Sequence, residues 1–162
     1  METVFLDKML IDAADKSFEG LHDEAEKILL DAAGEFPGSY LVHYNLGVLY
    51  VETGKPEKAI ASLEQAEKLK ENNCDILNEK ALAHQMTGNI KKALEYYEKA
   101  LLCSSSGHDR ALIQNNLGAI YFSMNSFVKA KEFFNKALTD DAGLEEARQN
   151  LLLVNTYLGI IG

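Results

Sequence analysis

The chain of 162 residues has little proline and no tryptophan, and it lacks the signals of β-strands. It contains two prolines, and no alternating run of Val, Ile and Thr is bounded by Asn-Gly or Asp-Gly turns. Ala, Leu, Glu and Lys are abundant instead, and these residues lose little side-chain freedom in a helix. The sequence therefore predicts an all-α protein.

Basic residues and long apolar runs are also scarce. Lys and Arg number 16 against 25 Asp and Glu, which gives a formal net charge of −9. A nucleic-acid or anionic membrane surface requires clustered Lys and Arg, so we expect no nucleic-acid partner and a protein partner that is neutral or basic. The N-terminus METVFLDKML has no cationic start followed by an apolar core, and no apolar run reaches about 20 residues. We predict a cytoplasmic protein without membrane insertion.

Residues that could carry chemistry are few. Cys74 and Cys103 do not have the number or spacing of a metal site or of a small disulfide-rich fold, so we expect buried, inert thiols. The chain has no Gly-rich phosphate loop, nucleophile elbow or paired metal-ligand spacing. We therefore predict a protein that is not an enzyme, with no catalytic residues, metal or cofactor.

The chain repeats itself. The hexapeptide NLGVLY at 45–50 returns as NLGAIY at 116–121, and related segments begin at Ile11 and Glu79, so the period is 34 residues. Three extra residues are assigned to the Ser- and Gly-rich stretch CSSSGHDR at 103–110, where we expect an inserted loop that holds His108. The predicted units are 6–39, 40–73, 74–107 and 111–144, followed by a C-terminal helix at 145–162, all within a single domain 1–162.

Each unit is predicted to be a helix, a tight turn and an antiparallel helix. In the second halves, two alanine columns flank a large apolar residue on one helix face. The first column is Ala25, Ala59, Ala93 and Ala130, the large residues are Leu29, Leu63, Tyr97 and Phe134, and the second column is Ala32, Ala66, Ala100 and Ala137. Gly20, Gly54, Gly88 and Asn125 stand at the midpoints, where a left-handed residue ends the first helix.

This pattern resembles the tetratricopeptide repeat. The matches in the first helices are Leu46, Gly47 and Tyr50, and again Leu117, Gly118 and Tyr121, while the alanine columns match in all four units. The first unit departs from the family pattern, with Asp12 and Lys16 at the family's Leu and Tyr positions, and the third has Lys80 at the Leu position. The resemblance implies an α-α superhelix, a solenoid of about four helix-turn-helix repeats whose first helices line a concave groove. It also implies an interaction scaffold.

The resemblance maps 24 positions onto that groove, and they include four acids and no Lys or Arg. The predicted peptide-binding residues are Tyr44, Asn45, Val48, Glu52, Asn78, Glu79, Leu82, Asn115, Asn116 and Phe122. Asparagine amides can pair with the backbone of an extended peptide; alternatively, Asn45 and Asn116 only bond between neighbouring helices. The family's clamp for acidic C-termini needs cations where this chain has Leu10, Asp75 and Glu79, so we predict no such clamp.

The C-terminal segment EEARQNLLLVNTYLGIIG is apolar at eight of its last twelve positions. A solenoid needs its terminal apolar face covered, which predicts a capping helix. The apolar residues go most of the way round a turn, so the alternatives are a homodimer surface of Leu152, Leu153, Tyr157, Ile160 and Ile161, or a fragment whose next helix is missing. The preferred function is a non-catalytic protein–protein scaffold that holds a peptide or partner segment. The alternative is a self-associating structural or assembly protein.

Overall fold

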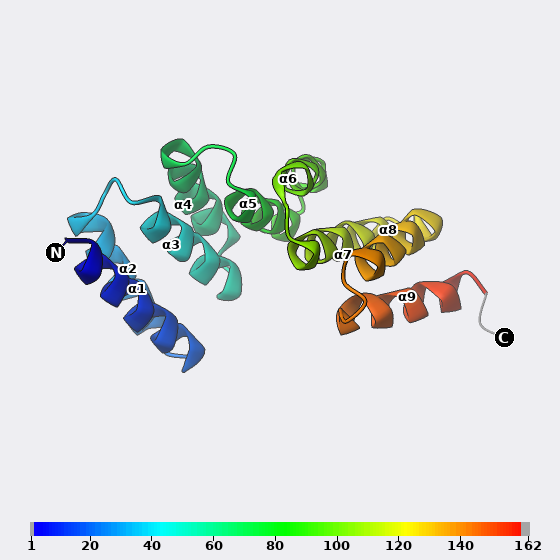
Figure 1. Cartoon of the computed structure of the whole chain (residues 1–162), viewed down its shortest axis with the longest axis horizontal. Helices are drawn as coiled ribbons and strands as arrows, with labels where there is room; N and C mark the ends of the chain where they lie inside the picture. Colours follow the sequence, from blue (N-terminus) through cyan, green and yellow to red (C-terminus); the bar gives the residue numbers. More distant parts are fainter. Residues whose placement is uncertain (1, 160–162) are drawn as a thin grey trace. The chain divides into compact units, whose positions relative to one another are not determined.

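The computed structural model describes residues 2–159, and over this range it contains nine α-helices and no strand (Figure 1). The helices are α1 (Glu2–Phe18), α2 (His22–Glu35), α3 (Tyr40–Glu52), α4 (Pro56–Leu69), α5 (Cys74–Met86), α6 (Ile90–Cys103), α7 (Gly107–Ser123), α8 (Phe127–Asp140) and α9 (Glu145–Tyr157). The all-α prediction is confirmed. The chain forms two compact units, which we call unit 1 (Met1–Tyr96) and unit 2 (Tyr97–Gly162). The single domain stays a prediction.

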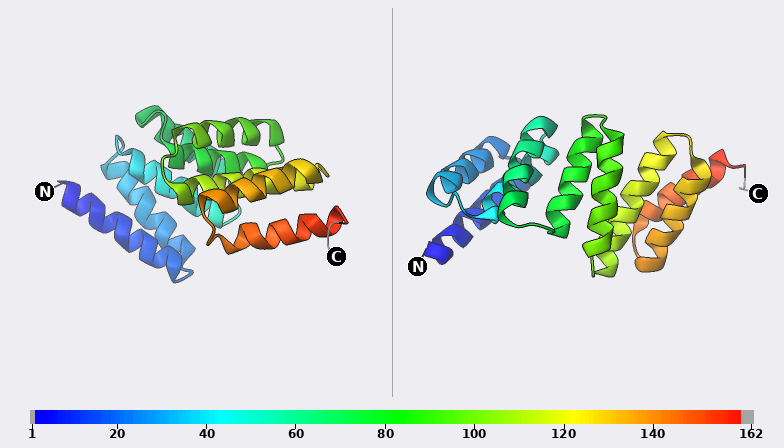
Figure 2. Two further views of the ribbon diagram at one scale, coloured as in Figure 1. Left: turned by 45° about the vertical axis from the view of Figure 1, so that its right-hand side comes forward. Right: turned by 90° about the horizontal axis from the view of Figure 1, so that it is seen from above.

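Tight turns join the helices of each repeat. Within unit 1, α1 packs against α2 and α3 against α4, and within unit 2, α7 packs against α8 (Figures 1 and 2). All four midpoint residues, Gly20, Gly54, Gly88 and Asn125, have positive φ, between 57° and 78°. Glycine and asparagine adopt this left-handed conformation at least cost, so the predicted end of each first helix is confirmed.

The two alanine columns form the contact between paired helices. All eight alanines have no exposed surface, and Leu63 and Phe134 between them are buried. The first helix of a repeat approaches its partner so closely that a Cβ added at Gly47 would lie 2.5 Å from the Leu63 side chain. A Cβ at Gly118 would lie 2.5 Å from Phe134. The repeated Leu-Gly pair is therefore explained by helix contact, because only glycine leaves room for the large apolar residue.

The predicted loop at 103–110 is mostly helical, and this part of the prediction is wrong. Helix α6 ends at Cys103 and α7 begins at Gly107, so His108 lies in the first turn of α7. The Ser106 side chain caps this turn by accepting a hydrogen bond from the backbone N–H of Asp109 at 3.4 Å. The extra residues therefore lengthen a helix to 17 residues, against 13 in α3, because a serine N-cap allows helix formation to begin earlier.

Helix α9 covers one side of unit 2. Its Ala147 and Val154 are fully buried, and Val154 packs in one cluster with Phe134. The other face is open, with Leu152 62% exposed and Leu153 46% exposed. Helix α9 thus has the buried face of a cap and an exposed apolar face as well. The predicted oligomer residues Ile160 and Ile161 lie outside the described residues.

Candidate functional site

A cavity of about 440 Å³ lies in unit 1 among α1, α2 and α3. Its walls are largely apolar and include Ala14 of α1, Leu29 of α2, and Val48 and Leu49 of α3. Phe18, the last residue of α1, lines its edge and is 95% exposed. The volume and the apolar lining are those of sites that bind small ligands or single side chains.

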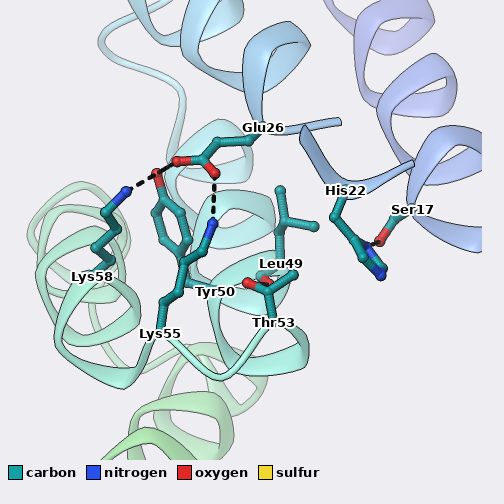
Figure 3. A network of polar contacts seen from close by, with 8 residues as sticks. All are labelled: Ser17, His22, Glu26, Leu49, Tyr50, Thr53, Lys55 and Lys58. Carbon is teal, nitrogen blue, oxygen red and sulfur yellow. Dashed lines mark hydrogen bonds and ion pairs between the residues drawn. The ribbon is translucent and has the colours of Figure 1, made fainter. Parts of the chain in front are cut away.

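Three polar side chains meet at the edge of this cavity. Ser17 Oγ donates a hydrogen bond to Glu52 Oε2 at 3.0 Å, which links α1 to α3. It also lies 3.4 Å from His22 Nδ1 (Figure 3). The Ser17 hydroxyl has a single proton, which it donates to the Glu52 carboxylate. In the second contact Ser17 Oγ is therefore the acceptor and His22 Nδ1 the donor. A nucleophilic serine needs a histidine that accepts its proton, and this arrangement does not provide one.

Predicted groove residues of α3 and α5 also form an acidic surface in unit 1. Its carboxylates are those of Glu52, Asp75 and Glu79. Burial raises the pKa of Glu79, the Asn78 hydrogen bond opposes this, and Glu52 and Asp75 raise the pKa further. Burial and then the charges of Glu79 and Asp75 raise the pKa of Tyr44. Over the described residues, no ion pair includes any of the three carboxylates. The surface therefore carries acidic side chains that no Lys, Arg or His of residues 2–159 pairs with.

The predicted asparagines of unit 1 bond within their own helices. Asn45 lines the cavity and donates from Nδ2 to the Leu41 carbonyl at 2.8 Å, so the alternative of a bond between helices is wrong for this residue. Asn78 donates from Nδ2 to Glu79 Oε1 at 3.2 Å. Its Oδ1 is buried and, among the described atoms, accepts no hydrogen bond. Leu82 is half-buried on the same helix.

Asn115 is the more deeply buried of the two predicted asparagines in unit 2, and it has a structural role. Asn115 is 1% exposed, and its Oδ1 accepts a hydrogen bond from Asn150 Nδ2 at 2.9 Å, which ties α7 to α9. Asn116 and Phe122 are half-buried, and the Phe122 ring lies 5.1 Å from that of Tyr157. The candidate site in unit 1 thus consists of the cavity and the acidic surface, and Asn115 is not available to a partner.

Residues of α2 complete the cavity and were missed by the sequence analysis. The groove positions were taken from first helices alone, whereas His22, Ala25 and Leu29 belong to a second helix. Periodicity gives no signal for them, because the repeat pattern marks Ala25 and Leu29 as core. Ala14, Ser17 and Phe18 belong to the first helix of the first repeat and line the cavity, but they are not among the residues predicted to bind.

A second polar cluster in unit 1 holds three helices together (Figure 3). The Glu26 carboxylate of α2 accepts hydrogen bonds from Tyr50 Oη at 2.9 Å, from Lys55 Nζ at 2.9 Å and from Lys58 Nζ at 3.2 Å. The Lys55 bond, followed by the Tyr50 bond, lowers the pKa of Glu26 to about 2. The next unit has Ile60 at this register, so the repeat pattern did not reveal the cluster.

Two histidines and the two cysteines complete the list of residues that could carry chemistry. The histidine rings contact neighbouring groups of the fold, and the cysteines are not free thiols. His43 Nε2 lies 3.2 Å from the Pro37 carbonyl, and the His84 ring stacks on Tyr96 with centroids 5.4 Å apart. Cys74 and Cys103 are half-buried and neither is a free thiol, so the expectation of buried, inert thiols is wrong. Within residues 2–159 we find no cluster of His, Cys, Asp or Glu suited to a metal ion and no helix that could cross a membrane.

Comparisons with known proteins agree with the repeat pattern. Two tetratricopeptide repeat models match residues 19–76 and 73–141. The Photosystem I assembly protein Ycf3 of Cuscuta gronovii is 30% identical over 78 residues, which are 48% of this chain and 46% of Ycf3. The chain therefore spans about half the length of the curated relatives it matches.

Solved structures show the same fold. PilF of Pseudomonas aeruginosa has a TM-score of 0.84 at 19% identity, over 94% of this chain and 68% of PilF. MamA has a TM-score of 0.76 at 23% identity, over 91% of this chain and 84% of MamA. The fold class is an α-α superhelix, and the chain belongs to the tetratricopeptide repeat family. The fold supports a role in protein–protein interaction or assembly, and proteins of this family are generally non-catalytic scaffolds.

Proposed function

We propose that the first helices of unit 1 hold an extended, neutral or basic segment of a partner protein. The observation that carries this proposal is the acidic surface of Glu52, Asp75 and Glu79, which lies beside an apolar cavity and has no ion pair over the described residues. A basic segment would supply the missing positive charge, whereas an acidic segment would meet like charge.

The polar groups favour a segment that presents its backbone. Asn45 still has its Oδ1 as an acceptor, since its known bond uses Nδ2. Asn78 Oδ1 accepts no hydrogen bond from the described part of the chain, and a buried acceptor without a partner costs free energy. An extended peptide offers backbone N–H groups at regular intervals, and small rotations of the two amides would allow them to accept from it.

A photo-crosslinking experiment tests this proposal. Glu52 is replaced by benzoylphenylalanine, and the full chain is irradiated in lysate of the source cells. We expect a covalent adduct with a partner protein, identified by mass spectrometry, whose crosslinked peptide is neutral or basic. The control carries the same group at Gln65, an exposed residue of α4 outside the proposed surface. An adduct of equal yield from both positions, or from neither, would contradict the proposal.

A second candidate function is self-association through α9. The observation that favours it is the exposed apolar face, with Leu152 62% exposed, Leu153 46% exposed and Tyr157 60% exposed. Large apolar surface on a soluble domain often marks an interaction site. In this case the chain would act as an assembly protein, and the partner would be a second copy.

A further inference from the structure

We propose that the cavity among α1, α2 and α3 is an anchor pocket for one large apolar side chain of the partner, directly beside a Lys or Arg that pairs with Glu52. This inference rests on the proposed function and specifies the partner segment that the surface of unit 1 recognises. The occupant is a peptide segment of another protein with an apolar residue next to a basic one.

The shape of the pocket carries the first half of the proposal. The cavity of about 440 Å³ can accept an aromatic or branched aliphatic side chain. Ala14 of α1 and Val48 of α3 both line it, and their short side chains occupy little of the space.

Phe18 supports an apolar occupant. This phenylalanine lines the pocket and is 95% exposed, although exposure of an aromatic ring to water is unfavourable. Gly20 forces the chain to turn at φ 78°, so α1 ends at Phe18 and the ring is held at the edge of the pocket. A side chain that enters the pocket would cover this ring, and aromatic residues of this type are enriched at the centres of interfaces.

The charge at the edge identifies the neighbouring residue of the occupant. Glu52 lines the pocket and is exposed, and among the described residues it accepts a hydrogen bond only from the neutral hydroxyl of Ser17. Glu79 and Asp75 add negative charge on the same side of unit 1. Lys55, the nearest lysine to Glu52 in the sequence, is paired with Glu26, and Lys16, next to Ser17, is paired with Glu19 and Glu24. A cation on the partner beside the anchored side chain is therefore the complementary arrangement.

Selection from a random heptapeptide phage library against the full chain tests the inference. We expect enriched peptides to carry Phe, Leu, Ile or Met within two positions of Lys or Arg. The leading peptide is then synthesised with a fluorophore, and its Kd is measured by anisotropy on the wild type and on four variants. Circular dichroism and thermal melts confirm that each variant folds.

Two variants alter the site and two are matched controls. Ala14→Phe fills the pocket from an exposed position and is compared with Ala61→Phe, an exposed alanine of α4 outside the pocket. Glu52→Gln removes the charge and is compared with Glu98→Gln, an exposed acid of α6. We expect Ala14→Phe to raise Kd about tenfold or more, because the apolar side chain can no longer be buried. We expect Glu52→Gln to raise Kd several-fold at low salt and less at high salt, with both controls close to wild type.

The outcomes separate the two proposals. Peptides that are enriched without the apolar–basic pattern, or that bind Ala14→Phe as tightly as the wild type, overturn the anchor pocket and leave peptide binding standing. If the library yields no peptide above background, the proposed function fails together with this inference. If light scattering gives the mass of a dimer for the wild type and of one chain for Ala14→Phe, a second copy occupies the pocket, and the proposal of a peptide occupant is wrong.

Discussion

At the scale of single residues, two kinds of side chain decide how the helices of unit 1 meet. Gly47 provides the space into which Leu63 packs, and Glu26 gathers Tyr50 and two lysines from neighbouring helices. The first contact depends on the absence of a side chain and the second on a charge. The two can therefore be tested separately, one by volume and one by pH.

The volume test is Gly47→Ala. The new methyl group would lie 2.5 Å from Leu63, which is fully buried and cannot move aside, so we expect the free energy of unfolding in urea to fall by about 1–3 kcal/mol. The matched control is Gly34→Ala in α2, where an added Cβ meets nothing within 4 Å. Alanine favours a helix over glycine, so the control should be as stable as the wild type or up to about 1 kcal/mol more stable. Equal losses in both variants would contradict the packing argument.

The pH test is Glu26→Gln. The pKa of Glu26 is about 2 in the folded protein against an ordinary value of 4.5, so its contribution to stability is present above about pH 4.5 and is lost as the pH falls toward 2. We expect the variant to be less stable than the wild type by about 1–2 kcal/mol at pH 7, since Lys55 and Lys58 are partly exposed and water screens their charges. The difference should shrink at pH 3. Glu98→Gln is the control, and a constant difference at all pH values would refute the assignment.

At the scale of helices, the ends of each element depend on short local signals. Asn73 precedes α5 and accepts a hydrogen bond from the backbone N–H of Ile76 at 3.0 Å. Ser39 precedes α3 in the same position, but its side chain makes no capping bond. Ser106 precedes α7 and accounts for the start of that helix inside the predicted loop. A cap is therefore a local device whose use differs between repeats.

The pair Asn73→Ala and Ser39→Ala tests the role of the caps. Removing the Asn73 side chain leaves an N–H of α5 without its partner, so we expect the free energy of unfolding to fall by about 1 kcal/mol. The Ser39 side chain makes no such bond, and its removal should cost a few tenths of a kcal/mol at most. Both values come from urea denaturation at one pH. A larger loss for Ser39→Ala than for Asn73→Ala would contradict this account.

At the scale of the whole molecule, net charge and exposed apolar side chains have opposite effects on the association of two copies of the chain. The net charge of −9 opposes close approach of two chains, whereas the exposed Leu152 and Leu153 favour it. The fully buried side chains of α9, Ala147 and Val154, face its own unit. We therefore expect α9 to complete the core of unit 2 within one chain and not to form an interface with a second copy.

Light scattering at several protein concentrations tests this view. We expect the mass of one chain throughout, because the buried face of α9 is already satisfied. The variant Leu152→Glu with Leu153→Glu changes only exposed positions, so its mass and its melting temperature should match those of the wild type. A wild-type mass that rises with concentration, and that returns to one chain in the variant, would instead support the second candidate function.

The sequence by itself determined the helices and their pairing. The period of 34 residues places alanines and large apolar residues on one face, and those positions are buried in all four repeats. The turns were equally predictable, because Gly20 and the corresponding residues are among the few that adopt positive φ easily. These features are local or repeat at a fixed spacing, so a single sequence contains the information.

Only the tertiary structure decided which residues are available to a partner. Asn115 and Asn45 look alike in the sequence, yet Asn115 is buried against Asn150 while Asn45 lines the cavity. The cavity itself joins side chains from three helices, and Phe18 at its edge stands at the register where the next repeat has Glu52. Periodicity predicts the face of a helix, but exposure depends on which side chains from distant segments pack over that face. That packing is a property of the folded chain.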